Sequence, residues 1–299
     1  MKEKVLVIMS TYNGEKYIKQ QIDSILAQVD VNVDILIRDD GSKDRTVEII
    51  KSLYPEIKLI EGENEGYKQS FMLALKAAGD YKYYAFSDQD DVWLPEKLRV
   101  GIKAIESHSA TPAFYCSNLI VTDEKLNRLS MLHKDSERIQ MSISNAVVEN
   151  ISYGCTLIFN KKLKDLALKK IPKYVSHDGW INLLGLFFGI GIYDENSYIL
   201  YRQHGKNVLG GDRSLKTVWK KRMKSFKKLK EHHRDLEAME FYEVYSDMMN
   251  RSQKETALKV ANYRKSLINK FKLLFDRKIR MSTFDRDFWY RVRVICSNI

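Results

Sequence analysis

Apolar residues along the first ninety positions follow two alternating patterns. Short apolar runs bounded by turn-forming residues predict four strands, at 5–9, 34–38, 57–60 and 83–86. The segments between these runs carry apolar residues at helical spacing and predict three helices, at 17–28, 47–53 and 67–78. Strands that alternate with helices in this way predict an α/β fold, in which helices cover a central, mostly parallel sheet.

The pattern is mixed from about residue 110 to 212. It predicts strands at 114–121 and 156–159 and a buried helix at 180–188. The longest apolar stretch, 183–192, has ten residues and includes three glycines, whereas a helix that spans a bilayer needs about 20 apolar residues. We therefore expect no membrane-spanning segment.

The last third of the chain has no proline after Pro172 and carries apolar residues at helical spacing, so we expect helices there. One apolar stripe consists of Leu215, Trp219, Met223, Phe226 and Leu229. A second consists of Ala257, Val260, Ala261, Leu267, Phe271 and Leu274. Each stripe fits two interpretations: the core of a helical subdomain, or an apolar surface that enters the headgroup region of a membrane.

Charge divides the chain into two parts. The net charge is +11, but residues 1–212 carry 27 Lys and Arg against 29 Asp and Glu, while residues 213–299 carry 23 against 10. We therefore expect a main domain at 1–212 and a basic helical region at 213–299. This region is expected to bind the anionic inner face of a membrane or to form a homo-oligomer with other copies of the chain.

The composition is that of a folded protein from a reducing compartment. The hydrophobic content of 44% supports a substantial core. Three widely spaced cysteines, Cys116, Cys155 and Cys296, indicate no disulfide framework. The apolar run at the N-terminus has five residues, too few for a signal peptide. A cytoplasmic location is expected.

Polar groups follow three of the predicted strands, at 10–13, 39–42 and 88–91. Each group alone would be read as a solvated turn, and Asp44 is placed to cap the helix after the second. In a parallel sheet, however, the carboxyl ends of the strands meet at one edge, where ligands bind. Three polar groups at one edge favour a binding site over three unrelated turns.

The third group is strongly acidic and reads SDQDDVW at 87–93. Asp88, Asp90 and Asp91 repel one another, so a cation or hydrogen bonds must offset their charge. The D-x-D spacing suits Mg²⁺ or Mn²⁺ held against a diphosphate. An EF-hand is excluded because the loop lacks its glycine and its terminal glutamate, and neither a dinucleotide-binding nor a P-loop fingerprint is present.

Four motifs in order, STYNGEKYI, DDGSKDRT, Asn64-x-Gly66 and SDQDDVW, resemble those of the inverting family-two glycosyltransferases. The resemblance is dense over the first hundred residues, thinner to about residue 210, and implies a GT-A nucleotide-sugar fold. The form SDQDDVW, with the later HDGW and YRQHG, is further similar to bacterial rhamnosyltransferases that build capsule, O-antigen or rhamnan polysaccharides.

The resemblance also assigns roles to residues. It implies that the nucleotide-sugar is bound by Ser10, Thr11, Tyr12, Asp39, Asp40, Asn64, Gly66, Asp88 and Arg202. It implies a divalent metal, Mn²⁺ or Mg²⁺, at Asp88, Asp90 and His204, with Asp90 preferred as the direct ligand. Arg202 would act as a charge-assisted donor to phosphate.

Asp178 stands where the family carries its catalytic base, which deprotonates the acceptor hydroxyl as that oxygen attacks the sugar. The alternative is that Asp178 only caps the helix that follows. His177 is a departure from the Glu-Asp pair of many relatives, and a protonated His177 would lower the pKa of the base. Cys155 is expected to be a small core residue and not a nucleophile.

The resemblance, together with the basic C-terminal region, implies a metal-dependent inverting transfer of L-rhamnose from dTDP-L-rhamnose to a lipid-linked or polysaccharide acceptor, at the cytoplasmic face of a bacterial membrane. The choice of rhamnose rests on the resemblance only. A UDP-hexose donor is the alternative within the same class. A non-catalytic basic module that binds membrane or nucleic acid is the alternative from another class. No nucleic-acid motif is found, so no nucleic-acid partner is expected.

Overall fold

The computed structural model describes residues 2–134, 139–204, 233–297 and 299. The chain divides into two compact units, one formed by residues 1–135 and 151–202 and the other by residues 136–150 and 203–299. The predicted boundary after residue 212 and the predicted stripe from Leu215 to Leu229 lie outside the described residues. The sequence had not assigned residues 136–150 to the second unit.

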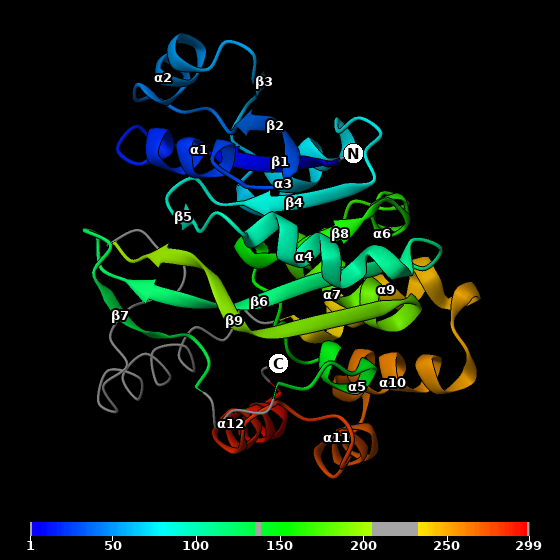
Figure 1. Cartoon of the computed structure of the whole chain (residues 1–299). Coiled ribbons are helices and arrows are strands. Elements are labelled where there is room, and N and C mark those ends of the chain that lie inside the picture. Colours follow the sequence, from blue (N-terminus) through cyan, green and yellow to red (C-terminus); the bar gives the residue numbers. More distant parts are fainter. Residues whose placement is uncertain (1, 135–138, 205–232, 298) are drawn as a thin grey trace. The chain divides into compact units, whose positions relative to one another are not determined.

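A single twisted sheet forms the centre of the first unit (Figure 1). Its strands are β1 (Glu3–Thr11), β2 (Val31–Asp39), β3 (Lys58–Glu61), β4 (Tyr83–Ser87), β5 (Val92–Trp93), β6 (Ala113–Thr122), β7 (Arg128–Met131), β8 (Ile158–Asn160) and β9 (Ile190–Arg202). They are ordered β3-β2-β1-β4-β8-β6-β9-β5, with β7 paired to β6. The strands β3, β2, β1, β4, β6 and β9 run in one direction, and β8, β5 and β7 run in the other.

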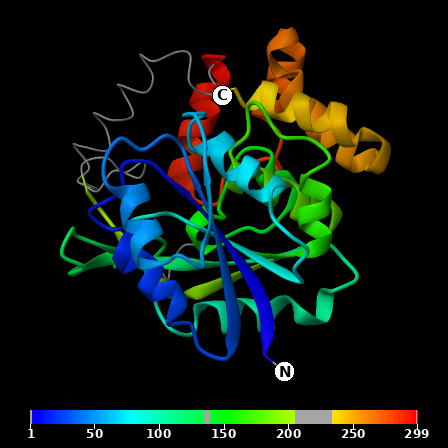
Figure 2. The same ribbon diagram turned by 90° about the horizontal axis from the view of Figure 1, so that it is seen from above.

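Helices cover both faces of this sheet (Figures 1 and 2). They are α1 (Ile18–Leu26), α2 (Thr46–Leu53), α3 (Tyr67–Lys76), α4 (Lys97–Ile105), α6 (Lys161–Ala167) and α7 (His177–Phe188), with 3₁₀ turns at Glu106–His108 and Gly154–Thr156. A methyl group on Gly101 of α4 would lie 2.9 Å from the Tyr115 ring, and one on Gly185 of α7 would overlap the Phe114 ring. Because adjacent strand residues point to opposite faces, α4 and α7 pack on opposite sides of β6.

The strands and helices predicted in the first ninety residues are confirmed, with ends that differ by a few positions. The helix predicted at 180–188 begins earlier, at His177, because the Ser176 side chain accepts a hydrogen bond from the Gly179 N–H at 3.4 Å. The helix α2 begins at Thr46 and has Arg45, not the expected Asp44, at its N-cap position. Asp44 lies one residue earlier and accepts a hydrogen bond from the Thr46 N–H at 3.0 Å.

The second unit is helical, as predicted for the basic region. Its helices are α5 (Ile143–Ala146), α9 (Arg234–Tyr245), α10 (Arg251–Ala261), α11 (Leu267–Leu274) and α12 (Phe284–Ile295), with 3₁₀ turns at Ser246–Met248 and Tyr263–Lys265. Glu149 joins residues 136–150 to this unit, since its carboxylate accepts hydrogen bonds from the Ser282 N–H at 2.7 Å and the Arg286 guanidinium at 2.8 Å. Among the described helices, none has the length and hydropathy needed to cross a membrane.

Candidate active site

The loops that follow β1 and β2 are joined by hydrogen bonds at the carboxyl edge of the sheet. The Asn13 N–H donates to the Ser42 hydroxyl at 2.9 Å, and the Lys43 N–H returns a bond to the Asn13 side chain at 2.8 Å. The Gly14 N–H donates to the Thr46 hydroxyl at 2.8 Å. The first two predicted polar groups therefore form one connected rim, as the strand order requires.

Asp39 is buried and fully used within this rim. Its Oδ1 accepts the N–H groups of Gly41 and Ser42, and its Oδ2 accepts the hydroxyls of Thr11 and Ser42, at 2.6–3.1 Å. A carboxylate offers about four acceptor positions, so these bonds occupy all of them. Thr11 and Asp39 thus hold the shape of the rim, and direct contact of either with a nucleotide stays a prediction.

Asp40 is also buried but keeps an acceptor position. It pairs with the Arg38 guanidinium and accepts the N–H groups of Glu65 at 3.0 Å and Gly66 at 2.9 Å. Gly66 has φ +78°, a conformation that favours glycine. These bonds fix the loop that carries the exposed Asn64. Asp40 can therefore order this loop and still accept one more hydrogen bond.

The remaining predicted residues of the rim differ in exposure. The Ser10 hydroxyl donates to Ser70 at 2.6 Å. The Tyr12 side chain is exposed, while its backbone exchanges two hydrogen bonds with the Gln89 amide at 2.9 and 3.1 Å. A methyl group on Gly14 would overlap Gln89, so this glycine permits the bridge between the first and third polar groups. Tyr12 is left facing outward, available to a ligand.

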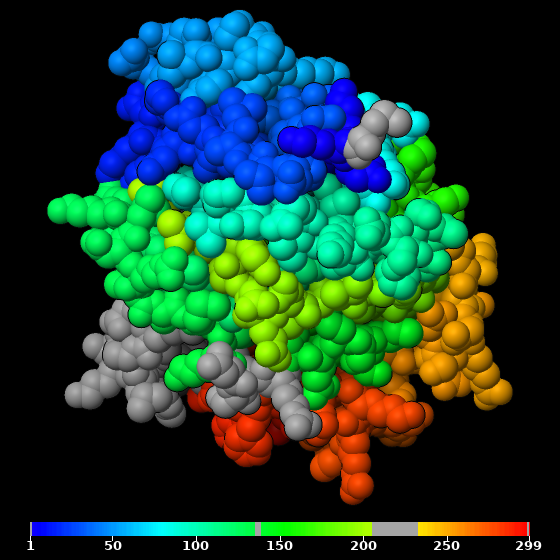
Figure 3. Space-filling view, viewed as in Figure 1, coloured from blue at the N-terminus to red at the C-terminus, as the bar shows by residue number. Residues whose placement is uncertain are grey.

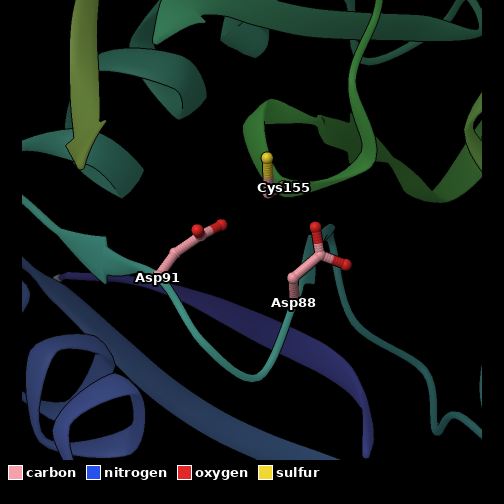
Figure 4. Close-up of side chains that lie close together, drawn as sticks. All are labelled: Asp88, Asp91 and Cys155. Carbon is pink, nitrogen blue, oxygen red and sulfur yellow. The ribbon is translucent and has the colours of Figure 1, made fainter. Parts of the chain in front are cut away.

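The acidic loop after β4 forms a compact cluster with a residue from elsewhere in the chain. Asp88, Asp91 and Cys155 place ligand-type atoms within 4.8 Å of one another. Figure 4 shows the two aspartates on one loop and Cys155 on a separate segment. Among the described residues, Asp90 and His204 are not part of this cluster, and His204 belongs to the second unit. Their roles in holding a metal stay predictions.

Burial raises the pKa of both clustered carboxylates. For Asp88, burial and then the charges of Asp90 and Asp178 raise the pKa to about 7. For Asp91, burial and then Asp90 and Asp88 raise the pKa well above its ordinary value. One oxygen of Asp91 accepts a hydrogen bond from the backbone N–H of Arg202 at 3.1 Å. The other is buried and has no hydrogen-bond partner within the described residues.

The cluster fits a hard divalent cation in its donor chemistry. Mg²⁺ and Mn²⁺ prefer carboxylate oxygens, and a cation would relieve the repulsion and the unpartnered oxygen of Asp91. Burial raises the pKa of the Cys155 thiol well above its usual range, so the thiol stays protonated and is a poor ligand. The fitting pair is therefore Asp88 and Asp91.

A buried lysine lies near this cluster. The Lys97 ammonium lies 3.5 Å from the centre of the Trp93 ring and has no hydrogen-bond partner among the residues that the structure describes. Burial lowers the pKa of Lys97 to about 7, against the attraction of Cys155 and Asp91. The signal was present in the sequence, since Lys97, Gly101 and Ile105 recur every four residues and share one helix face. Lys97 supplies positive charge that partly offsets the acidic cluster.

Arg202 is buried and forms hydrogen bonds with several segments around the cluster. Its guanidinium donates to the backbone oxygens of Asp90 at 2.8 Å and Glu124 at 2.7 Å, and to the Gln20 side chain at 2.6 Å. It also lies 4.7 Å from the centre of the Tyr17 ring. These hydrogen bonds hold the backbone of Asp90 beside that of Glu124 and the side chain of Gln20. Its predicted contact with phosphate stays a prediction.

Asp178 lies in the first turn of α7, where both interpretations of this residue have support. Its Oδ1 accepts the Ser176 hydroxyl and the Gly179 N–H, the latter at 2.8 Å. Ser176 is the helix cap, so Asp178 contributes to the helix start without being the cap itself. Asp178 is half-buried, and its charge raises the pKa of Asp88. A carboxylate therefore stands within electrostatic reach of the acidic loop.

His177 is not a protonated neighbour of Asp178. Its ring is buried and stacks on Phe71 with centroids 4.0 Å apart. Neither ring nitrogen has a hydrogen-bond partner in the described part of the chain. Burial lowers the pKa of His177 to about 4, so the ring is neutral near pH 7. The expectation that a protonated His177 would lower the pKa of the base therefore does not apply. Gly154 makes room for the ring, since a methyl group there would lie 2.6 Å from Nε2.

Comparison with known sequences identifies one family and several relatives. Residues 6–167 match the sequence model of glycosyl transferase family 2. The dTDP-rhamnosyl transferase RfbG of Shigella flexneri is 29% identical over 233 residues, which are 71% of this chain and 77% of that protein. The uncharacterized glycosyltransferase RP339 of Rickettsia prowazekii is 30% identical over 159 residues, which are 52% of this chain and 49% of that protein.

Solved structures share the fold. The S. aureus TarS fragment 1–349 in complex with UDP-GlcNAc has a TM-score of 0.53 at 17% identity, over 91% of this chain and 86% of that one. The mannosyltransferase PcManGT of Pyrobaculum calidifontis, in complex with GDP-Man and Mn²⁺, has a TM-score of 0.53 at 15% identity, over 100% of this chain and 89% of that one. The expected GT-A type α/β fold with a helical C-terminal region is confirmed.

Proposed function

Because the chain belongs to glycosyl transferase family 2, we propose that it transfers a sugar from a nucleotide-diphospho-sugar to a saccharide acceptor with inversion at the anomeric carbon. One observation carries this proposal: Asp178 stands within electrostatic reach of Asp88. A base and a diphosphate site must lie on either side of one anomeric carbon for such a transfer.

The donor we propose is dTDP-L-rhamnose. The support is the relative whose name gives dTDP-rhamnosyl transferase, together with the SDQDDVW, HDGW and YRQHG motifs. A UDP-hexose is the alternative donor, since the TarS neighbour binds UDP-GlcNAc. The pyrimidine base and ribose would contact Ser10, Tyr12 and Asp40, with Asn64 and Gly66 on the adjoining loop.

A divalent cation, Mn²⁺ or Mg²⁺, would be held by Asp88 with Asp91. Asp90 and His204 stay predicted metal ligands. Its chemistry would be to offset the charge that builds on the leaving diphosphate. Tyr12, exposed on the rim, would orient the nucleotide, and Arg202 would add positive charge near the same diphosphate.

Asp178 would act as the general base. It would take the proton of the acceptor hydroxyl while that oxygen forms a bond to the anomeric carbon, on the face opposite the diphosphate. The bond between the anomeric carbon and the diphosphate oxygen breaks with its electron pair on the nucleotide, so the configuration inverts. The neutral His177 ring would exclude water from behind the carboxylate.

The acceptor we propose is a lipid-linked or polysaccharide chain of bacterial cell-surface polysaccharide synthesis, reached from the cytoplasmic face of the membrane. The support is the resemblance to rhamnosyltransferases and the excess of basic residues after residue 212. Anionic headgroups and a lipid diphosphate would both attract this region.

Sugar transfer tests the proposal directly. The full chain would be incubated with a bacterial lipid extract, Mn²⁺ and radiolabelled dTDP-L-rhamnose, UDP-glucose or UDP-GlcNAc in separate reactions, and label would be counted in the organic phase. Transfer from dTDP-L-rhamnose is the expected result. Transfer from a UDP-sugar alone would keep the class and reject rhamnose, whereas no transfer and no binding of any donor would reject the function.

A further inference from the structure

The helix α11 exposes its apolar face. Leu267, Ile268 and Phe271 lie within one face of this helix at 3.6 residues per turn and are 55–70% exposed, and Phe275, just past its end, is 73% exposed. Leu273, on the opposite side, is fully buried. The helix therefore packs into its unit through the side that carries Leu273 and leaves its larger apolar face exposed. Apolar faces of surface helices normally point inward.

The neighbouring helix α12 repeats this arrangement. Phe284 is 89% exposed, and Phe288 and Ile295 lie on the same face of the helix and are more than half exposed. Tyr290 and Val294 are buried on the other side. Single exposed apolar side chains are common on protein surfaces, but here two helices of one unit each expose several of them on one face.

The two helices are bonded to each other within the second unit. The Lys270 ammonium of α11 donates to the Ile295 carbonyl at 3.1 Å and the Ser297 hydroxyl at 2.6 Å, and Arg291 of α12 donates to the Asp276 carbonyl at 3.2 Å. In Figure 3 atoms of both helices, orange and red, lie at the molecular surface. We call the exposed apolar side chains of α11 and α12 the apolar surface; they are Leu267, Ile268, Phe271, Phe275, Phe284, Phe288 and Ile295.

The segment that carries the apolar surface is rich in basic residues. Residues 263–299 carry ten Lys and Arg against three Asp. Two of these aspartates are paired, Asp276 with Lys259 at 2.6 Å and Asp287 with Arg291 at 2.9 Å. Exposed cations include Lys272 on α11 and, in the following loop, Arg277, Lys278 and Arg280. The local field is therefore positive, and an anionic partner is required to match it.

We propose that the apolar surface inserts into the interface of an anionic lipid bilayer, with Lys272 and the basic loop 277–280 on the headgroup phosphates. Aromatic and aliphatic side chains flanked by lysine and arginine are the composition of interfacial helices. A second copy of the chain would bring the same positive charges together, which disfavours self-association. The inference rests on the proposed function and deepens its membrane location. It places the contact on α11, whose Leu267 and Phe271 belong to the second predicted stripe, and on α12.

Vesicle flotation of the full chain tests this surface. Wild type would be mixed with vesicles of phosphatidylcholine alone or with 40% phosphatidylglycerol, beside Phe271→Ser/Phe275→Ser and the matched control Leu53→Ser/Leu129→Ser. The control removes two apolar residues of the first unit that are at least half exposed, Leu53 at 50% and Leu129 at 58%. We expect wild type to bind the anionic vesicles at least tenfold more strongly than the phosphatidylcholine vesicles, and added salt to weaken this binding. Binding to the anionic vesicles should fall about tenfold in the Phe variant and stay unchanged in the control.

Two results would overturn the inference: no preference of wild type for anionic vesicles, or equal binding by the Phe variant and wild type. A wild-type dimer by light scattering that becomes a monomer in the Phe variant, without vesicle binding, would instead assign the surface to self-association. Thermal stabilisation by nucleoside diphosphates is measured on the same proteins. It reports on donor binding alone, so a failure of the membrane inference can be told apart from a failure of the proposed function. The Phe variant should retain that stabilisation, whatever the vesicles show.

Discussion

Neighbouring residues Asp178 and His177 occupy opposite surroundings at the start of α7. Asp178 is half-buried and accepts hydrogen bonds from Ser176 and Gly179, whereas His177 is enclosed by aromatic rings of Phe71 and Phe86. One turn of helix thus places a polar carboxylate beside an apolar wall. This arrangement suits a base that must be reached by one hydroxyl and shielded from water.

The role of Asp178 gives a first prediction. Asp178→Asn removes the proton acceptor but preserves size and the bond from Gly179, so transfer should fall about 10²–10⁴-fold. Donor binding, measured by thermal stabilisation, should be unchanged. Asp165→Asn, an exposed aspartate on α6, is the matched control and should transfer normally. Full activity in Asp178→Asn would return this residue to a structural role at the helix start.

The buried His177 gives a second prediction. Its pKa of about 4 in the folded chain lies below its ordinary value of 6.5, so between these pH values only the unfolded chain binds the proton. The free energy of unfolding should therefore fall as the pH drops from 6.5 to 4, by about 3 kcal/mol from this residue.

Urea unfolding at intervals from pH 7 to pH 4 measures that loss. His177→Leu keeps an apolar group against Phe71 and cannot titrate, so its unfolding free energy should fall less steeply than that of wild type over this range. Parallel curves for the two proteins would show that His177 is not held neutral by the fold.

The packing of helices on the sheet depends on glycines at close contacts. Gly101 brings α4 onto β8 and β6, where a methyl group would overlap Ile158 and approach Tyr115. Gly185 does the same for α7 on the other face against Phe114. Interiors are packed at crystal density, so an added methyl group forces the helix away from the sheet.

A third prediction follows from this packing. Gly101→Ala should destabilise the protein by about 1–3 kcal/mol, and Ile158→Val alone by about 0.5–1.5 kcal/mol. The double variant should lose less than the sum of the two, because valine lacks the methyl group that the new alanine would overlap. Denaturant unfolding of the four proteins measures the coupling. Strict additivity would place the strain elsewhere.

Elements of the first ninety residues could be predicted because each combines a local apolar pattern with a turn signal. The strand β9 was not predicted, because its ends are set by long-range pairing and not by a local pattern. It runs beside β6 over most of its length, although residues 194–197 are polar. Local patterns do not report such pairing. The 3₁₀ turn at Gly154–Thr156 likewise displaced the start of a predicted strand.

At the scale of the whole molecule, the part of the site that lies at the strand ends could be predicted from the sequence. The three polar groups were expected at one edge of the sheet, and the hydrogen bonds between them confirm that they meet there. Cys155 was not expected beside the acidic loop, because residues distant in sequence meet this loop only after the sheet forms. The recruitment of residues 136–150 to the second unit depends on Glu149 in the same way.

The most direct test of the account is thermal unfolding with dTDP, UDP, GDP or ADP, each with and without Mn²⁺. The central claim is that Asp88 and Asp91 hold a divalent cation against a nucleoside diphosphate. A ligand bound only by the folded chain raises the melting temperature, by a few degrees at about 100 times its Kd.

We expect a shift with dTDP that requires Mn²⁺, is lost in Asp88→Asn and in Asp91→Asn, and is kept in Asp123→Asn, a half-buried aspartate outside the cluster. A shift with UDP instead would retain the site and change the donor. No metal-dependent shift with any nucleotide, or an equal shift in Asp88→Asn, would contradict the account.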